Sequence, residues 1–170
     1  MAVSENDLLA IEARAQAATG ERWRIERESN GIATVLVHHR DGSTSNLRLT
    51  HDADPAPAAD VAFVAHSRDD LDRLVRAVRG QVALSAEDAR WIADRCDRAS
   101  KGLWRVFLES DGGMGGSNVI WIGESNYAPD LYLWLDSRIA PDEDFVFVAH
   151  ARQDIPRLLD EVRRRGHGAE

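Results

Sequence analysis

Two histidines and two arginines recur at matching places in a segment that the chain contains twice. The segment reads D-x-x-F-V-A-H-x-R-x-D in both copies and begins at Asp60 and at Asp144. Imidazole and guanidinium groups together can bind an anion or a nucleotide phosphate. If the copies meet across a pseudo-twofold axis, the four side chains form one paired site. The residues of this predicted ligand site are His66, Arg68, His150 and Arg152.

The same segment also has a purely structural interpretation. A histidine within an apolar V-A-H-x-R stretch commonly packs in the fold and bonds a neighbouring carbonyl group. An arginine in this position commonly pairs with a nearby aspartate or caps a helix. Both interpretations stay open at the level of the sequence.

Other kinds of site chemistry have little support. The zinc-binding spacings H-E-x-x-H and C-x-x-C are absent, and the adjacent His38 and His39 would point to opposite faces of a strand. No G-x-S-x-G motif occurs, and the single cysteine, Cys96, lies in a helical pattern without an identifiable base. The glycine-rich stretch 111–117 lacks the G-K-[ST] ending of a phosphate-binding loop. We therefore expect no metal, no cofactor and no catalytic residue.

Aromatic residues are concentrated in the second part of the chain and suggest a surface for a protein partner. Tyr132 and Trp134 alternate with Leu131, Leu133 and Leu135, which is the period of a strand with two distinct faces. If the aromatic side is exposed, it forms a patch of the kind found in protein interfaces. If helices cover that side, the same residues belong to the core. The predicted partner-binding residues are Trp121, Tyr127, Tyr132 and Trp134.

The elements that must hold these residues are also present twice. Residues 4–31 match residues 85–112 at ten positions, and residues 60–80 match residues 144–164 at nearly the same offset. Such self-similarity indicates an internal duplication. Because the two copies are joined by only about five residues, we expect them to pack as one unit about a pseudo-twofold axis. The expected repeats are residues 1–80 and 81–170.

Each repeat predicts a helix, three strands and a closing helical segment. Ser4 and Ser85 precede apolar residues spaced three and four apart, as at the start of an amphipathic helix. Gly20 and Gly102 follow these helices, where a residue of positive φ commonly ends one. Runs of apolar and β-branched residues then predict a three-stranded meander in each repeat. These strands are expected over 23–28, 32–39 and 46–50, and over 104–110, 118–123 and 130–136, with loops at 52–59 and 137–141.

The closing segment can be a buried strand or a helix. Acidic residues precede both V-A-F-V-A-H and F-V-F-V-A-H, which suits a helix N-terminus and favours a helix. Asp70 and Asp154 resemble N-caps of a further helix, with Pro156 in its first turn. We therefore expect a helical hairpin or a bent helix. The predicted fold class is α+β, with tandem helix–three-strand–helix repeats, a mainly antiparallel sheet and packed helices.

Charge and composition restrict the class of protein. The net charge of −8 over 170 residues disfavours general binding to nucleic acid. The N-terminal residues lack a signal-peptide pattern, no run of 18 apolar residues occurs, and one cysteine cannot form an intramolecular disulfide. We expect a cytoplasmic protein without a membrane segment, and the sequence leaves the formation of a homo-oligomer open.

One combination of motifs resembles a known family. The sequences A-T-G-E-R-W-R at 18–24 and A-S-K-G-L-W-R at 99–105, each followed by D-x-x-F-V-A-H-x-R-x-D-[LI], resemble short phage and actinobacterial modules similar to the Ead-like phage accessory proteins. The likeness covers most of both repeats, although both lack the proline that usually precedes the tryptophan. It implies an accessory role of phage origin and assigns no catalytic residue. We predict a protein–protein interaction module, with a ligand- or nucleotide-binding protein as the alternative and an enzyme as the least favoured class.

Overall fold

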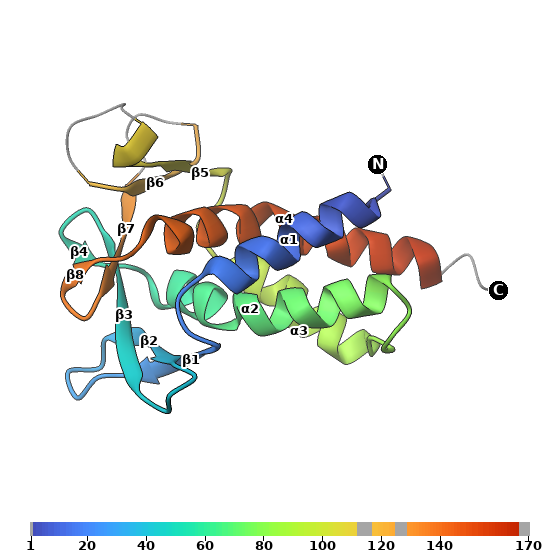
Figure 1. Ribbon diagram of the computed structural model, residues 1–170, viewed down its shortest axis with the longest axis horizontal. Coiled ribbons are helices and arrows are strands. Elements are labelled where there is room, and N and C mark those ends of the chain that lie inside the picture. Colours follow the sequence, from blue (N-terminus) through green and yellow to red (C-terminus); the bar gives the residue numbers. More distant parts are fainter. Residues whose placement is uncertain (1, 112–116, 125–128, 167–170) are drawn as a thin grey trace.

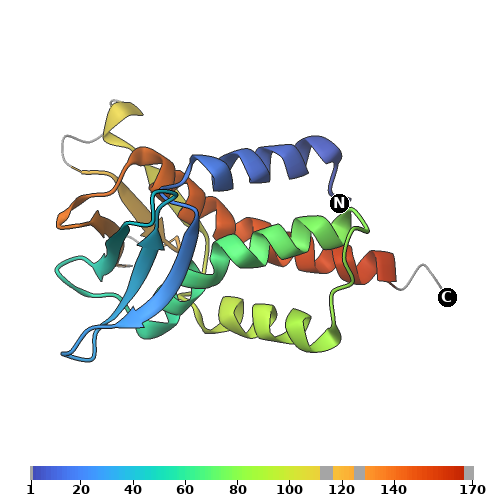
Figure 2. The same ribbon diagram turned by 60° about the horizontal axis from the view of Figure 1, so that its bottom comes forward.

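Four helices lie on one face of an antiparallel β-sheet in the part of the chain that the computed structural model describes, residues 2–111, 117–124 and 129–166 (Figures 1 and 2). The predicted α+β class with a mainly antiparallel sheet is confirmed. The helices are α1 (Glu5–Ala17), α2 (Ala58–Val78), α3 (Ala86–Arg98) and α4 (Asp142–Gly166). The strands are β1 (Arg22–Arg27), β2 (Ala33–His38), β3 (Thr44–His51), β4 (Asp54–Pro55), β5 (Trp104–Phe107), β6 (Val119–Ile122), β7 (Asp130–Leu135) and β8 (Arg138–Ile139).

The sheet runs without interruption through both halves of the chain. Its strand order is β1-β2-β3-β7-β6-β5, and each neighbouring pair is antiparallel. The short strands β4 and β8 fold back on β3 and β7 as hairpins, within segments that the sequence predicted as loops. The strand β5 ends at Phe107, and a 3₁₀ turn over Glu109–Asp111 follows where a longer strand was expected.

The central pair of strands, β3 and β7, has a register with twofold symmetry. Leu49 faces Leu133, and these two residues are 84 positions apart, the offset that relates the closing segments of the repeats. Along the strands, this pair is flanked by Thr50 paired with Tyr132 and by Arg48 paired with Trp134. The pairing of β3 with β7 is therefore symmetric about Leu49 and Leu133, and the relation of the two halves by a pseudo-twofold axis stays a prediction.

Each closing segment is one continuous helix. The apolar stretches after Asp60 and Asp144 lie in the first turns of α2 and α4, so the preference for helix is confirmed. The prediction that Asp70 and Asp154 are N-caps is wrong, because both lie in the middle of a helix. Pro156 likewise lies inside α4 and not in a first turn.

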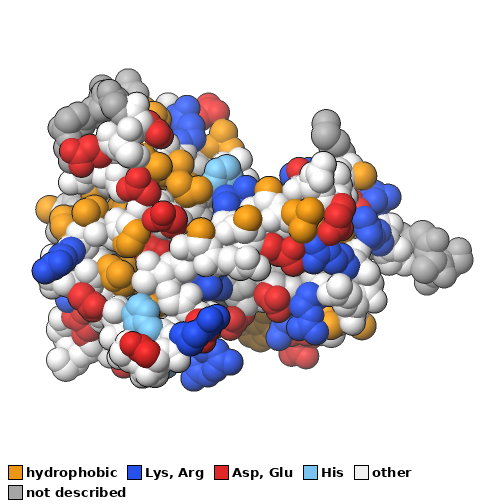
Figure 3. All heavy atoms as spheres, in the orientation of Figure 1, with side chains coloured by type: hydrophobic (Ala, Val, Ile, Leu, Met, Phe, Trp, Pro, Cys, Tyr) orange, Lys and Arg blue, Asp and Glu red, His pale blue; other side chains and the backbone are white. Residues whose placement is uncertain are grey.

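The helices α2 and α4 pack against each other and against the sheet, and α1 and α3 flank them on opposite sides (Figure 2). The Oγ atoms of Ser4 and Ser85 accept the N–H groups of Asp7 and Asp88, at 3.2 and 3.0 Å, as predicted for N-caps. Basic and acidic side chains are interspersed over the helices on the face seen in Figure 3. No helix among the described residues is both long and apolar enough to span a membrane.

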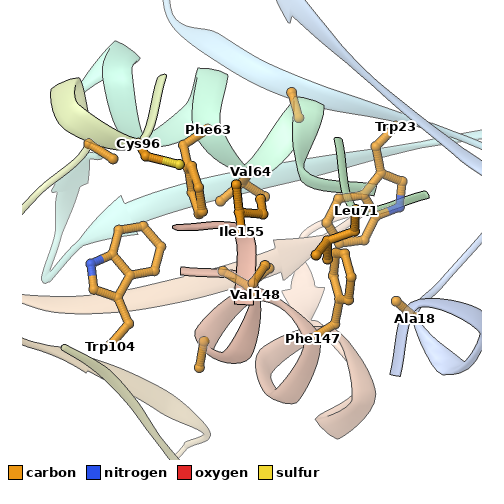
Figure 4. Packing of buried hydrophobic residues seen from close by; sticks show 14 of the residues in the cluster. Ala18, Trp23, Phe63, Val64, Leu71, Cys96, Trp104, Phe147, Val148 and Ile155 are labelled. Carbon is orange, nitrogen blue, oxygen red and sulfur yellow. The ribbon is translucent and has the colours of Figure 1, made fainter. Parts of the chain in front are cut away.

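The core joins the two halves through aromatic contacts (Figure 4). Trp23 of the first half meets Phe147 of the second edge to face, with 5.4 Å between ring centroids. Trp104 and Phe63 make the reciprocal contact at 5.6 Å. All four side chains are fully buried. Each half therefore completes its core with a phenylalanine from the other half.

Candidate functional site

The arginines of the repeated segment hold the C-terminal ends of the two flanking helices. Arg68 donates to the carbonyl oxygen of Ala18 at 3.0 Å, just past α1. Arg152 donates to the carbonyl oxygen of Ser100 at 3.5 Å, just past α3. Each guanidinium also lies over the ring of a core aromatic residue. The two arginines thus serve two separate helix ends.

The first aspartate of each repeated segment crosses to the other half. Asp144 Oδ1 accepts the N–H of Thr19 at 2.6 Å, and Asp60 accepts both the N–H and the hydroxyl of Ser100, at 2.6 and 2.7 Å. Asp60 is fully buried and its Oδ2 also lies 2.9 Å from His51 Nε2. Burial raises the pKa of Asp144. Each carboxylate therefore has a structural partner in the other half of the chain, although Asp144 Oδ2 has no hydrogen-bond partner.

The two histidines lie beside ion pairs that join the halves. His66 is close to the pair formed by Asp70 and Arg95, and burial followed by the charge of Arg95 lowers its pKa. His150 is in the equivalent place beside the 2.6 Å pair of Arg14 and Asp154, and burial followed by the charge of Arg14 lowers its pKa. The lowered pKa of each imidazole favours its neutral form, which disfavours a role in binding an anion.

The predicted ligand-site residues are consequently divided between the two sides of the α2–α4 pair. Of the four, Arg68 lines a hollow of about 300 Å³ between α1 and α2. Four carboxylates line the same hollow, which makes it unfavourable for a phosphate. A ligand role for His66, Arg68, His150 and Arg152 stays a prediction, and the structural interpretation explains the two arginines. The acidic residues of this hollow are Glu12, Glu21, Asp69 and Asp72.

The aromatic strands of the second half occupy the opposite face of the sheet. Leu131 and Leu133 are buried towards the helices, whereas Tyr132 and Trp134 are partly exposed on the face that no described helix covers. Trp121 has the same orientation on β6. Tyr127 lies outside the described residues. Their role in partner binding stays a prediction, but three of the four do share one uncovered face.

A fourth aromatic residue on this face was not recognised from the sequence. Phe107 packs against Trp121 with 4.2 Å between ring centroids. The alternation within W-R-V-F could have placed Phe107 opposite to the buried Trp104, but a stretch of four residues is too short to define a period. We define the aromatic face as Phe107, Trp121, Tyr132 and Trp134.

The aromatic face has no counterpart in the first half. Trp23 faces Val37 in the first half as Trp104 faces Ile122 in the second, which aligns β1 and β2 with β5 and β6. The Leu49–Leu133 pair aligns β3 with β7. The buried face therefore carries matched residues, while the uncovered face differs. In this alignment Glu26, Leu36, Arg48 and Thr50 correspond to Phe107, Trp121, Tyr132 and Trp134.

A hollow of about 670 Å³ lies on the uncovered face at the junction of the two halves. The indole Nε1–H of Trp134 donates to Thr50 Oγ1 across this junction at 3.1 Å. The hollow is therefore an inter-repeat site, although its lining contains none of the repeated histidines and arginines. Its lining residues are Asn46, Arg48, Thr50, Asp52, Ala53, Trp134, Asp136 and Ser137.

Catalytic groups do not stand out among the described residues. No group of three or more histidine, cysteine or carboxylate side chains there is arranged to hold a metal ion. Burial raises the pKa of the Cys96 thiol to about 11, so this cysteine is protonated and unreactive at neutral pH.

Comparison with protein-family models, with curated proteins and with solved structures finds no match to this chain.

Proposed function

We propose that this protein is a non-catalytic interaction module that binds a protein partner through the aromatic face of its second half. One observation carries the proposal: four aromatic residues lie on a sheet face that no described helix covers, at positions where the first half has Glu, Leu, Arg and Thr. The fold itself does not need aromatic residues there, because the first half forms the same sheet without them. An accessory role of phage origin, which the family resemblance suggests, belongs to this proposal.

The chemistry of the face supports a protein partner. Tryptophan and tyrosine offer large, rigid contact areas and dominate the binding energy of many interfaces. The rings here are already ordered by neighbours, as Trp134 is by Thr50 and Trp121 by Phe107, so binding would lose little side-chain entropy. A partner that covers the face would bury these partly exposed rings.

Site-specific photocrosslinking in cells would test this proposal. A photoreactive phenylalanine analogue is placed at Tyr132 or Phe107 in one set and at Arg24 or Glu26 of the first half in a matched set. We expect one defined protein to be crosslinked from the second-half positions, and much less of it from the first-half positions. Equal crosslinking from both sets, or none from the second-half set, would contradict a partner-binding aromatic face.

Reciprocal substitutions test the same face without a probe. Phe107→Glu, Tyr132→Arg and Trp134→Thr each introduce the residue that the first half has at the corresponding position. Because the sheet accommodates those residues in the first half, the variants should keep their circular dichroism spectrum. The amount of partner that copurifies with each variant should be lower by a factor of about ten or more than with the parent protein, as for the loss of an aromatic hot spot.

A further inference from the structure

The hollow on the uncovered face has a floor made by the central strand pair. Arg48 faces Trp134 in this pair, and the Trp134 indole is fixed by its 3.1 Å hydrogen bond to Thr50. The ring is partly exposed and lines the hollow. A ligand that enters the hollow therefore meets an aromatic surface whose orientation is set by the other half of the molecule.

Two aspartates that line the hollow lie in the tight turns of two β-hairpins. Asp52 and Asp136 have φ values of 51° and 47° and each begins the turn of a β-hairpin. Asp136 Oδ1 accepts the N–H of Asn46 at 2.8 Å, and Asp52 Oδ1 accepts the N–H of Asp130 at 3.3 Å. The hydrogen bond from Asn46, together with one from Ser45, lowers the pKa of Asp136. Both side chains are exposed, and their positions are held by backbone contacts.

The charge of the lining favours a cation. Arg48 is the basic residue among the lining residues, and its guanidinium is 2.7 Å from Glu28, outside the hollow. This ion pair neutralises Arg48 and leaves the two aspartates as the excess charge. Carboxylates beside an indole ring suit an ammonium or guanidinium group, which can pair with the former and stack on the latter. The same charges disfavour a phosphate or a nucleotide.

We propose that this hollow is a subsite for one lysine or arginine side chain of the protein partner, held over the Trp134 ring and paired with Asp52 or Asp136. The inference rests on the proposed function, because it assigns a specific contact to the partner surface. A basic anchor also agrees with the acidic net charge of the chain, −8, which attracts a basic partner.

Nuclear magnetic resonance titration with short peptides tests the subsite. The probes are Ac-Gly-Ser-Arg-Ser-Gly-NH₂, the same peptides with lysine and with glutamine at the centre, and methyl β-glucoside as a neutral polyol. We expect the arginine and lysine peptides to shift the Trp134 indole resonance saturably, with millimolar affinity that weakens at high salt. The affinity of the glutamine peptide should be lower by a factor of about five or more. The Trp91 indole on α3, on the helical side of the molecule, serves as the internal reference.

The variant pair Asp52→Asn and Asp136→Asn provides the matched control for charge. Asparagine tolerates positive φ and can still accept the same backbone N–H groups, so the turns should persist. The double variant should lose the preference for the basic peptides, whereas Asp69→Asn on the exposed surface of α2 should retain it. Equal binding of the glutamine peptide, preferential binding of the glucoside, or no shift with any probe would each overturn the subsite.

The two proposals can fail separately. Crosslinking from Tyr132 and Phe107 without any response to basic peptides would leave the partner face in place and remove the basic subsite. A charge-dependent response to the peptides without crosslinking from the aromatic positions would overturn the partner face and the assignment of the hollow to a partner side chain, and would leave only a cation-binding hollow.

Discussion

The aspartates that begin the two repeated segments stabilise the fold. Asp60 and Asp144 are the third residues of α2 and α4, where the helix dipole favours a carboxylate. Each accepts the backbone N–H of the residue that follows a flanking helix of the other half, Ser100 or Thr19. The first aspartate of each repeated segment therefore makes a contact between the two halves of the chain.

Removing either carboxylate should destabilise the protein strongly. Asp60→Ala leaves the N–H and hydroxyl of the partly buried Ser100 without their acceptors, and Asp144→Ala does the same to the N–H of the partly buried Thr19. We expect each to lower the free energy of unfolding by about 2–4 kcal/mol, measured by urea denaturation. Asp69→Ala, an exposed position on α2, should change it by less than about 0.5 kcal/mol. A loss no larger than that of Asp69→Ala would contradict the structural role.

The carboxylate of Glu161 should make the stability of the protein depend on pH in the acidic range. Glu161 accepts hydrogen bonds from Arg164, then Arg165, and these lower its pKa to about 2 from an ordinary value of 4.5. A group with a lowered folded pKa stabilises the native state above its unfolded pKa, and this contribution is lost as the pH falls through the folded value. Between pH 5 and pH 2 the Glu161→Gln variant should therefore lose about 1 kcal/mol less stability than the parent protein. Parallel stability curves for the two proteins would contradict this.

At the scale of elements, a close approach of backbones positions each flanking helix against its strand. Gly20 has a φ of 71°, and a Cβ placed on it would lie 2.5 Å from Val37 Cγ1 and 2.7 Å from the carbonyl oxygen of His38. Gly102 is equivalent, with a Cβ that would lie 2.7 Å from the Cα of Gly123. The joint between helix and first strand thus requires glycine for both conformation and space.

Replacing glycine by alanine at this joint should lower the free energy of unfolding far more than the same change in a turn with open space around it. Gly20→Ala should lower the free energy of unfolding by about 3 kcal/mol or more, because the backbone must shift as well as adopt a strained φ. Gly42→Ala, whose φ is 84° but which has open space around it, should cost only about 1 kcal/mol. Thermal and urea unfolding of the two variants would measure the difference. Equal costs would show that the close contact carries no energy.

At the scale of the whole molecule, the two halves form one interlocked body. They share the β3–β7 pair, the α2–α4 contact, two reciprocal aromatic contacts and the ion pairs Arg14–Asp154 and Arg95–Asp70. None of these contacts exists within a single half. Stability should therefore be a property of the whole chain and not a sum over two independent repeats.

A substitution in the core of one half should consequently lower the stability of the other half by the same free energy. Phe147→Ala removes a fully buried ring that packs on Trp23 of the first half, and should cost about 3–5 kcal/mol. Native-state hydrogen exchange would show the slowest amides of β2 and of β6 losing protection by the same free energy. If the amides of β2 kept their protection, the halves would be separate folding units.

Much of the local structure follows from the sequence because it depends on near neighbours. The N-caps Ser4 and Ser85, the positive φ at Gly20 and Gly102 and the helical closing segments were all predicted from spacing and residue type. The fold class followed from the order of these elements. Asp70 and Asp154 were assigned wrongly because a cap and a mid-helix ion pair use the same residue type, and the partner arginine lies elsewhere in the sequence.

The spacing of apolar residues predicts the helices, the six longer strands and the alternating pattern of β7, because period and turn chemistry act over a few residues. The sheet face that the helices cover could not be predicted in this way, because it depends on how α2 and α4 pack against each other and against the strands. That packing placed the repeated arginines at two separate helix ends and left the aromatic residues uncovered. It also brought Asp52, Thr50, Trp134 and Asp136 to one hollow, since residues 84 positions apart become neighbours only when β3 pairs with β7.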